Sequence, residues 1–181
     1  FDEIQTGYGR TGAFLAQEHF GVAPDACSLA KGIGGGFPLG AMAVAERLAG
    51  GLPPGSHAST FGGNPLACAA GLAVLHIMEE EGLIENARIQ GDYLAGRLAE
   101  LDSRLEATAG TRGLGLLQGL VLADEIDPGA TIGAVHAAGL LLTLAGGDVV
   151  RISPSLNVTQ DELDEGLAIL EAVLVDAPRK P

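Results

Sequence analysis

The sequence predicts an α/β fold in two parts, a glycine-rich α/β region followed by a smaller α+β domain. Residues 1–65 consist of short apolar runs separated by glycines, a pattern typical of strands and tight turns. Two later stretches carry leucines at helical spacing. The 181 residues are 47% hydrophobic and 18% charged, which is enough apolar material for a core. We expect residues 1–104 to form one domain with its connecting helix, and residues 105–181 to form a second.

The first part contains two predicted strands and one predicted helix. Residues 26–30 and 41–45 are short apolar runs, which predict buried strands. From residue 65 to about residue 81 the apolar spacing becomes helical, and Pro65 suits the first turn, where a missing N–H costs nothing. The apolar side chains expected on the buried stripe of this helix are Leu66, Ala69, Ala73 and Ile77.

The second part alternates helices and strands. Residues 84–105 predict a long helix, and residues 108–119 predict a turn-rich connection after it. The capping-box pair Thr159 and Glu162 predicts the start of the last helix. Leucines share one face of each helix: Leu94, Leu98, Leu101 and Leu105, then Leu163, Leu167, Leu170 and Leu174. The remaining predicted elements are strands at residues 116–122 and 149–152 and a helix at residues 131–138.

The charge balance argues against two classes of partner. A formal net charge of -13 is unsuited to nucleic acid or to an anionic membrane surface, since both attract basic proteins. The uncharged stretches 61–78 and 128–147 are interrupted by Gly, Pro, Asn and His, so we interpret them as core segments and not as membrane spans.

The cysteines and histidines predict no metal site. Cys27 and Cys68 lie 41 positions apart without a zinc-finger spacing, and the four histidines are scattered. Two free thiols fit a reducing compartment, which predicts a cytoplasmic protein. The chain opens at Phe1 without Met or a signal-like segment, so we expect it to be a C-terminal fragment whose first strand is incomplete.

Lys31 is the first candidate for chemistry, since Lys180 in the tail is the only other lysine. It follows an apolar run and precedes five residues that include four glycines, with Asp25 as the nearest acidic residue before it. An amine kept from water loses its proton more readily and attacks carbonyl groups, which favours a Schiff-base lysine. The alternative is a lysine at a strand end that reaches water.

Two further motifs have weaker interpretations. Gly7, Gly9 and Gly12 match G-x-G-x-x-G, the dinucleotide fingerprint, but no acidic residue follows at the required distance of about 20 residues. Tight-loop glycines are the better interpretation, and NAD binding remains an alternative. Ser28 and Lys31 match S-x-x-K, a serine acylase signature, but the S-D-N and K-T-G elements of that chemistry are absent.

Several segments together resemble the class III aminotransferases of the ornithine/acetylornithine type. Two of them resemble the pyridoxal-phosphate signature of that family: residues 1–7 with 9–12 (FDEIQTG and GRTG) and residues 29–40 (LAKGIGGGFPLG). Residues 57–67 (HASTFGGNPLA) are also similar to the family. Residues 112–116 (RGLGL) and 150–154 (VRISP) are similar to its C-terminal domain, although residues 153–155 are Ser-Pro-Ser where the family often has Ala-Pro-Pro. The resemblance covers nearly the whole chain in the right order.

This resemblance implies the C-terminal part of a fold-type I PLP-dependent transferase large domain, followed by the small domain. It also implies that pyridoxal 5′-phosphate is the cofactor and assigns roles to six residues. Asp2 is expected to hold the ring nitrogen protonated, Gln5 to bind the phenolic oxygen, and Lys31 to bind the cofactor covalently and then move a proton. Thr60, with Ser59 beside it, is expected to bind the phosphate of the neighbouring subunit's cofactor, and Arg151 the substrate carboxylate.

The implied reaction transfers the δ-amino group of N-acetylornithine to 2-oxoglutarate in arginine biosynthesis, in a homodimer. Amino donors of related enzymes, namely ornithine, succinylornithine and 4-aminobutyrate, are alternatives. The upstream half of such an enzyme, with the phosphate cup and the ring-stacking aromatic, is not in the sequence. A second hypothesis is therefore an inactive truncated fragment that packs against a partner, and we expect the isolated fragment to be inactive.

Overall fold

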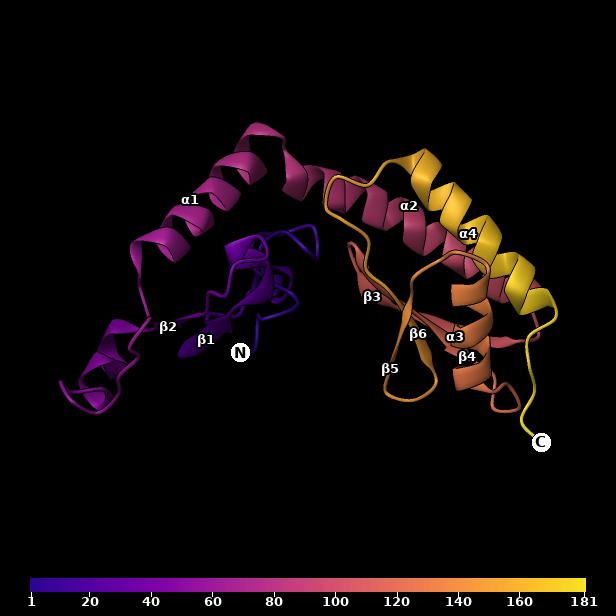
Figure 1. Cartoon of the computed structure of the whole chain (residues 1–181), viewed down its shortest axis with the longest axis horizontal. Helices are drawn as coiled ribbons and strands as arrows, with labels where there is room; N and C mark the ends of the chain where they lie inside the picture. Colours follow the sequence, from indigo (N-terminus) through magenta and orange to yellow (C-terminus); the bar gives the residue numbers. More distant parts are fainter. The chain divides into compact units, whose positions relative to one another are not determined.

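The computed structural model describes all 181 residues, which form two compact units, residues 1–85 and 86–181. Figure 1 shows the helices and strands of both units. The fold is mixed α/β, as the sequence predicts. No helix is both long enough and apolar enough to cross a bilayer. The predicted domain division at residue 104 stays a prediction.

The first unit is built around a small antiparallel pair of strands. Strand β1 (Ala26–Leu29) pairs with β2 (Ala41–Val44), which confirms both predicted strands. Their predicted burial is wrong, because only Cys27 is buried and residues 41–43 are exposed in this two-stranded sheet. Leu29 lies opposite Ala41, so the intervening turn-rich segment begins directly after β1. The short 3₁₀ helices of this unit are η1 (Ala16–Phe20), η2 (Lys31–Gly34) and η3 (Glu46–Gly51).

Helix α1 (Pro65–Glu80) begins where the sequence predicts. Asn64 is its N-cap, because the side-chain oxygen accepts a hydrogen bond from the Ala67 N–H at 2.9 Å. The cap satisfies one of the N–H groups that a helix start leaves without partners.

The predicted buried stripe of α1 is wrong. Leu66 and Ile77 are 65% and 46% exposed, whereas Ala67, Gly71 and Met78 are buried. The reason is the close approach of α1 to the η2 segment. A Cβ added at Gly71 would lie only 3.0 Å from Leu39 Cδ2 and 3.3 Å from the carbonyl oxygen of Ile33. Next to η2 the helix therefore packs through small residues, and Leu66 and Ile77 face outward, although Met78 near the end of the helix is buried.

The second unit contains a four-stranded antiparallel sheet in the order β3-β4-β6-β5. Its strands are β3 (Thr108–Leu114), β4 (Leu117–Leu122), β5 (Thr143–Ala145) and β6 (Val149–Ile152). Helix α2 (Leu83–Arg104) extends into this unit, which also contains α3 (Pro128–Ala137) and α4 (Gln160–Val175). The predicted strands at 116–122 and 149–152 and the predicted helices are confirmed, although α3 begins three residues earlier than predicted.

The core of this unit lies between the helices α2, α3 and α4 and one face of the sheet. Three of the four predicted leucines of α2, Leu94, Leu98 and Leu101, are at most 2% exposed. Leu105 is only partly buried, although it packs against the same core. The four predicted leucines of α4 are all buried as well. Both helices therefore cover the sheet with the faces that their leucine spacing predicts.

The start of α4 is the predicted capping box. The Glu162 N–H donates to the Thr159 hydroxyl at 3.3 Å, and the Thr159 N–H donates to the Glu162 carboxylate at 2.8 Å. The Thr159 hydroxyl also donates to this carboxylate, at 2.9 Å, and the two donors hold the pKa of Glu162 below its usual value, the backbone N–H with the larger effect. The carboxylate therefore supports the cap in its charged form.

The predicted turn-rich connection at 108–119 is wrong in its first half, because β3 occupies Thr108–Leu114. The glycines of this segment allow β3 to pair closely with β4 and do not end the strand. A Cβ added at Gly113 would overlap the carbonyl oxygen of Leu117 on the neighbouring strand. Gly110 and Gly113 have φ values of 129° and 140°, which side chains rarely allow. The three-residue edge strand β5 was not predicted, because so short a run has no recognisable period.

A glycine pair brings α2 against the β3–β4 turn, and this contact gives a stability prediction. A Cβ added at Gly91 would overlap the backbone of Gly115, whereas one added at Gly96 on the same helix would meet no atom within 4 Å. We expect Gly91→Ala to lower the free energy of unfolding by about 1–3 kcal/mol. Gly96→Ala is the matched control and should raise it by up to about 1 kcal/mol through helix propensity.

Urea unfolding followed by circular dichroism measures both variants of this pair. Equal effects of the two substitutions would contradict the contact between α2 and the β3–β4 turn.

Candidate active site

The first residues of the chain run parallel to β1. Asp2 and Ser28 form a parallel bridge, in which the Ser28 N–H donates to the Phe1 carbonyl at 2.9 Å and the Glu3 N–H to the Ser28 carbonyl at 3.0 Å. Parallel segments have their carboxyl ends at the same edge, which is where α/β proteins bind ligands. Asp2 and Gln5 lie at the end of one segment, and Lys31 lies just beyond the end of the other.

The Asp2 carboxylate is held through one of its oxygens. Oδ1 accepts hydrogen bonds from the Ile4 N–H at 3.0 Å and from the Ser28 hydroxyl at 3.3 Å. Oδ2 has no hydrogen-bond partner in the chain, and the side chain is exposed. The two donors therefore fix the plane of the carboxylate and leave Oδ2 available to a donor from outside the chain.

Lys31 begins η2 directly after β1, and its backbone is strained. Its φ of 52° lies in the left-handed region, which costs roughly 1–2 kcal/mol for a residue with a Cβ. Lys31 is exposed and forms no ion pair or hydrogen bond in the chain. Its side chain therefore reaches water, as the alternative interpretation predicts, and this chain does not desolvate the amine. Strained residues cluster at functional sites, so the geometry is consistent with a functional lysine.

The loop between Asp2 and η1 lies against the Lys31 turn. A Cβ added at Gly32 would be 3.9 Å from Tyr8 Cβ, and Tyr8 itself has a left-handed φ of 55°. The Tyr8 and Phe14 rings pack with centroids 5.0 Å apart. Burial raises the pKa of the Tyr8 hydroxyl and lowers that of the Arg10 guanidinium. Tyr8 therefore stays a neutral packing residue beside Lys31.

The other residues expected at the site in the first unit are exposed. Gln5 lies in the turn after Asp2. Ser59 and Thr60 lie in a segment in which residues 46–63 are all exposed. The Ser59 carbonyl accepts a hydrogen bond from the Gly62 N–H at 3.4 Å. The hydroxyl groups of Ser59 and Thr60 form no hydrogen bond within the chain. Nothing in the structure places Ser59 or Thr60 beside Asp2.

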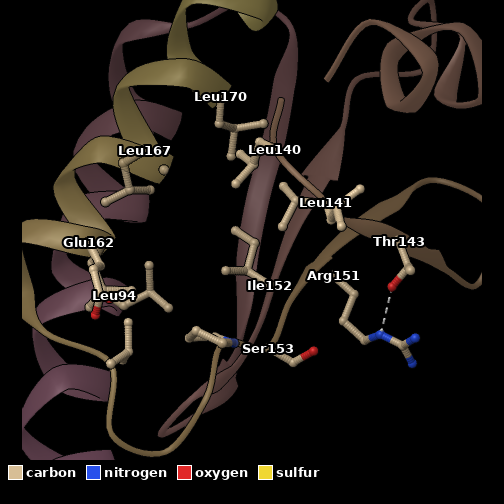
Figure 2. Close-up of a pocket in the computed structure, with 15 residues that line it drawn as sticks. Leu94, Leu140, Leu141, Thr143, Arg151, Ile152, Ser153, Glu162, Leu167 and Leu170 are labelled. Atoms are coloured by element: carbon tan, nitrogen blue, oxygen red, sulfur yellow. Dashed lines mark hydrogen bonds between the residues drawn. The ribbon is translucent and has the colours of Figure 1, made fainter. Parts of the chain in front are cut away.

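Arg151 belongs to the second unit and lies on β6, opposite Gly119 of β4 and Thr143 of β5. Its Nε donates to Thr143 Oγ1 at 3.1 Å. Figure 2 shows this side chain pointing away from Ile152, because neighbouring residues of a strand face opposite sides of the sheet. Arg151 therefore lies on the face of the sheet that α2 and α4 do not cover.

The cavity beside β6 is apolar. It has a volume of about 280 Å³ and is lined mainly by leucines of α2, α4 and the segment before β5. Figure 2 shows Leu167, Leu170 and Ile152 directed into it. Arg151 is among the residues that line the cavity, although its guanidinium points away from Ile152.

The structure adds one residue to the expected set. In the sequence Ser28 stands out only as part of an S-x-x-K motif, whereas in the structure its hydroxyl donates a hydrogen bond to Asp2. Its position next to the expected Asp2–Lys31 pair could not be inferred from spacing, because Asp2 lies 26 residues away. No group of three His, Cys, Asp or Glu side chains could hold a metal ion, and both cysteines are free.

Comparison with known proteins places these features in one family. The family profile "Aminotransferase class-III" matches residues 1–174. An acetylornithine aminotransferase of Gloeobacter violaceus is 49% identical over 178 residues, which are 98% of this chain and 44% of that protein. A succinylornithine transaminase of Yersinia pseudotuberculosis is 46% identical over 173 residues, which are 94% and 42% of the two chains.

A solved structure shows the same fold. It is an ornithine aminotransferase of Toxoplasma gondii, reported with partial occupancy of PLP at its active site. It superposes with a TM-score of 0.89 at 32% identity over 97% of this chain and 42% of that chain. The chain thus spans less than half the length of the relatives it matches.

Proposed function

The chain belongs to the class III aminotransferase family, and from this membership we propose that it forms the C-terminal part of an enzyme that transfers the δ-amino group of N-acetylornithine to 2-oxoglutarate in arginine biosynthesis. The family uses pyridoxal 5′-phosphate, amino donors and 2-oxo acids. The observation that carries the proposal is Asp2 at the same edge as Lys31, with one oxygen fixed and the other available.

The residues of this edge fit the cofactor by their chemistry. When bound, pyridoxal phosphate supplies an electron sink for negative charge that develops on the substrate carbon. Asp2 Oδ2 accepts the hydrogen bond of the protonated ring nitrogen, which keeps that proton in place. The fit rests on the orientation of the carboxylate, because Ile4 and Ser28 already occupy Oδ1.

The lysine and the glutamine have different tasks. Lys31 Nζ is the amine that would hold the cofactor covalently, with loss of water, and that would move a proton at the substrate carbon once the amino donor has taken its place. Its exposed position without an ion-pair partner leaves the amine free for both tasks. Gln5, in the turn three residues after Asp2, donates a hydrogen bond to the phenolic oxygen.

The remaining roles belong to exposed hydroxyls and to one arginine. Thr60 and Ser59 donate hydrogen bonds to the phosphate, and we propose that they do so for the cofactor of a second subunit in a homodimer. Their exposure supports this assignment, since hydroxyls without partners in their own chain can donate to a group of a second subunit. Arg151 binds the substrate carboxylate with its guanidinium fork, and the hydrogen bond from Nε to Thr143 orients that fork.

The proposal extends to the whole protein. This chain covers 42–44% of its relatives, so we expect the isolated chain to be inactive and the complete enzyme to supply the rest of the cofactor pocket. Two free cysteines support a reducing, cytoplasmic location.

A substrate panel on the complete enzyme tests this function. We expect turnover per KM with N-acetylornithine to exceed that with ornithine, succinylornithine and 4-aminobutyrate by about 10-fold or more, because the binding site must discriminate the donor's distal group. Glutamate formed from 2-oxoglutarate is measured for each donor. A higher value for another donor would overturn the substrate while retaining the aminotransferase, and no turnover with any donor would overturn both.

A further inference from the structure

Glu3 is the only buried residue in the chain that carries a formal charge, with 3% of its surface exposed. Its Oε1 accepts the Gln17 N–H at 3.0 Å, and its Oε2 accepts the Ala16 N–H at 3.2 Å together with the Thr6 hydroxyl. A buried carboxylate is costly unless such donors surround it. These three donors therefore explain why an acidic side chain is stable in this position.

The carboxylate closes a loop. Ala16 and Gln17 lie 13 and 14 residues after Glu3, so these hydrogen bonds join the two ends of the segment 4–15. The Gly7 N–H also donates to the Glu3 carbonyl at 3.0 Å, and a Cβ added at Gly7 would lie 2.8 Å from that oxygen. The segment is thus folded tightly onto the backbone of Glu3.

The closed loop contacts both halves of the proposed site. Its first residues are Ile4, whose N–H holds Asp2 Oδ1, and Gln5. Its Tyr8 lies against Gly32, next to Lys31, and both Tyr8 and Lys31 have left-handed backbones. A left-handed residue with a Cβ needs surrounding structure to hold it. Glu3 is therefore connected to Asp2 along the chain and to Lys31 through the loop.

We propose that Glu3 is a positioning residue, whose carboxylate closes the 4–15 loop and thereby holds Asp2, Gln5 and the Lys31 turn for the cofactor. The inference rests on the proposed function. Glu3 does not take part in proton transfer, because three donors occupy its oxygens and the group is buried. It acts through its neighbours.

The variant Glu3→Gln, made in the complete enzyme, tests the role. It keeps the volume but turns one oxygen into an NH₂ group that faces the donors of Thr6, Ala16 or Gln17. We expect the dissociation constant for pyridoxal phosphate to rise about 10-fold, the effect of one lost charge-assisted hydrogen bond. We also expect the pH profile of the bound cofactor's absorption to shift, because Asp2 no longer holds the ring-nitrogen proton in the same geometry.

The matched control is Glu18→Gln. Glu18 also accepts a backbone N–H at the start of η1, from Leu15 at 2.7 Å, but it is exposed and does not contact the site. For Glu18→Gln, the dissociation constant for pyridoxal phosphate and the pH profile of cofactor absorption should equal those of the wild type. Thr6→Val, which removes only one donor to Glu3, keeps the test usable if Glu3→Gln does not fold, and it should shift both readouts in the same direction by a smaller amount.

The outcomes separate the two proposals. A folded Glu3→Gln protein with wild-type affinity and a wild-type absorption profile would overturn the positioning role, since a residue that only stabilises the fold leaves the folded site unchanged. If Glu3→Gln does not fold, wild-type values for Thr6→Val would overturn it as well. A wild-type enzyme that does not bind pyridoxal phosphate would instead overturn the proposed function.

Discussion

Replacing Lys31 by alanine is expected to abolish covalent attachment of pyridoxal 5′-phosphate and to lower transaminase turnover by about 10²–10⁴-fold, the contribution of a positioned general base. Alanine removes both the nucleophile and the amine that carries the proton. The left-handed backbone at this position is no obstacle to the comparison, because alanine meets the same Cβ restriction as lysine. The variant should therefore fold and bind the cofactor without a covalent bond.

The chain offers a matched control, since it contains only one other lysine. Lys180 lies in the C-terminal tail, where its Nζ donates to the Asp124 carbonyl at 2.6 Å. Lys180→Ala should retain turnover and cofactor attachment. Borohydride reduction followed by peptide mass mapping should locate the cofactor on the peptide that contains Lys31. Cofactor found on the peptide of Lys180, or full activity of Lys31→Ala, would contradict the assignment.

A small amine added to the Lys31→Ala enzyme distinguishes loss of chemistry from loss of structure. Methylamine can enter the space that the lysine side chain leaves and accept the proton in its place. We expect it to restore part of the turnover of Lys31→Ala in proportion to the concentration of free base. It should have no effect on the wild type, and a misfolded variant would show no such rescue.

The elements that were predicted correctly are those in which local pattern and burial agree. The leucines of α4 and the pair Thr159–Glu162 specify a helix, its start and its buried face within one short segment. The strand before Lys31 is similarly local. These patterns lie within one short segment, so they can be recognised from a single sequence without knowledge of distant residues.

The errors have a common cause, which is contact between distant backbones. In α1, Gly71 and Ala67 are buried because the η2 segment approaches closely, so size and not hydrophobicity selects the buried face. In β3, Gly113 permits a close strand pair, although glycine usually indicates a turn. Glycine frequency alone does not distinguish a turn from a close approach, because both need the absence of a Cβ.

The sequence indicates which residues are candidates for the site, but not which hydrogen bonds hold them in place. Lys31 is a candidate from its own sequence context, and the family resemblance adds Asp2, whereas Ser28 and Glu3 form hydrogen bonds to residues 26 and 13 positions away. Such bonds depend on the fold that brings two segments together. Their donors and acceptors are common residue types, so no motif marks them in advance.

Asp2→Asn is expected to lower turnover by about 10²–10³-fold, the scale for loss of one preorganised electrostatic partner. The direction of the asparagine side chain follows from the structure. Its amide oxygen takes the place of Oδ1, because the Ile4 N–H and the Ser28 hydroxyl both donate there. The NH₂ group then occupies the position of Oδ2 and directs a donor at the ring nitrogen. Two donors cannot share that position, so the ring nitrogen loses its proton and the electron sink weakens.

The comparison variant is Asp25→Asn, which makes the same chemical change in the same unit. Asp25 directly precedes β1 and pairs with Arg47 at the surface, where an ion pair contributes little. Turnover and the pH profile of cofactor absorption are measured for both proteins. Asp2→Asn should shift the profile toward a deprotonated ring nitrogen, and Asp25→Asn should leave it unchanged. Ser28→Ala removes one of the two donors that fix the amide. In the double variant Ser28→Ala/Asp2→Asn the amide can turn its oxygen toward the ring, so its turnover should be higher than that of Asp2→Asn alone. Equal turnover in Asp2→Asn and Asp25→Asn would show that the Asp2 carboxylate does not hold the ring-nitrogen proton.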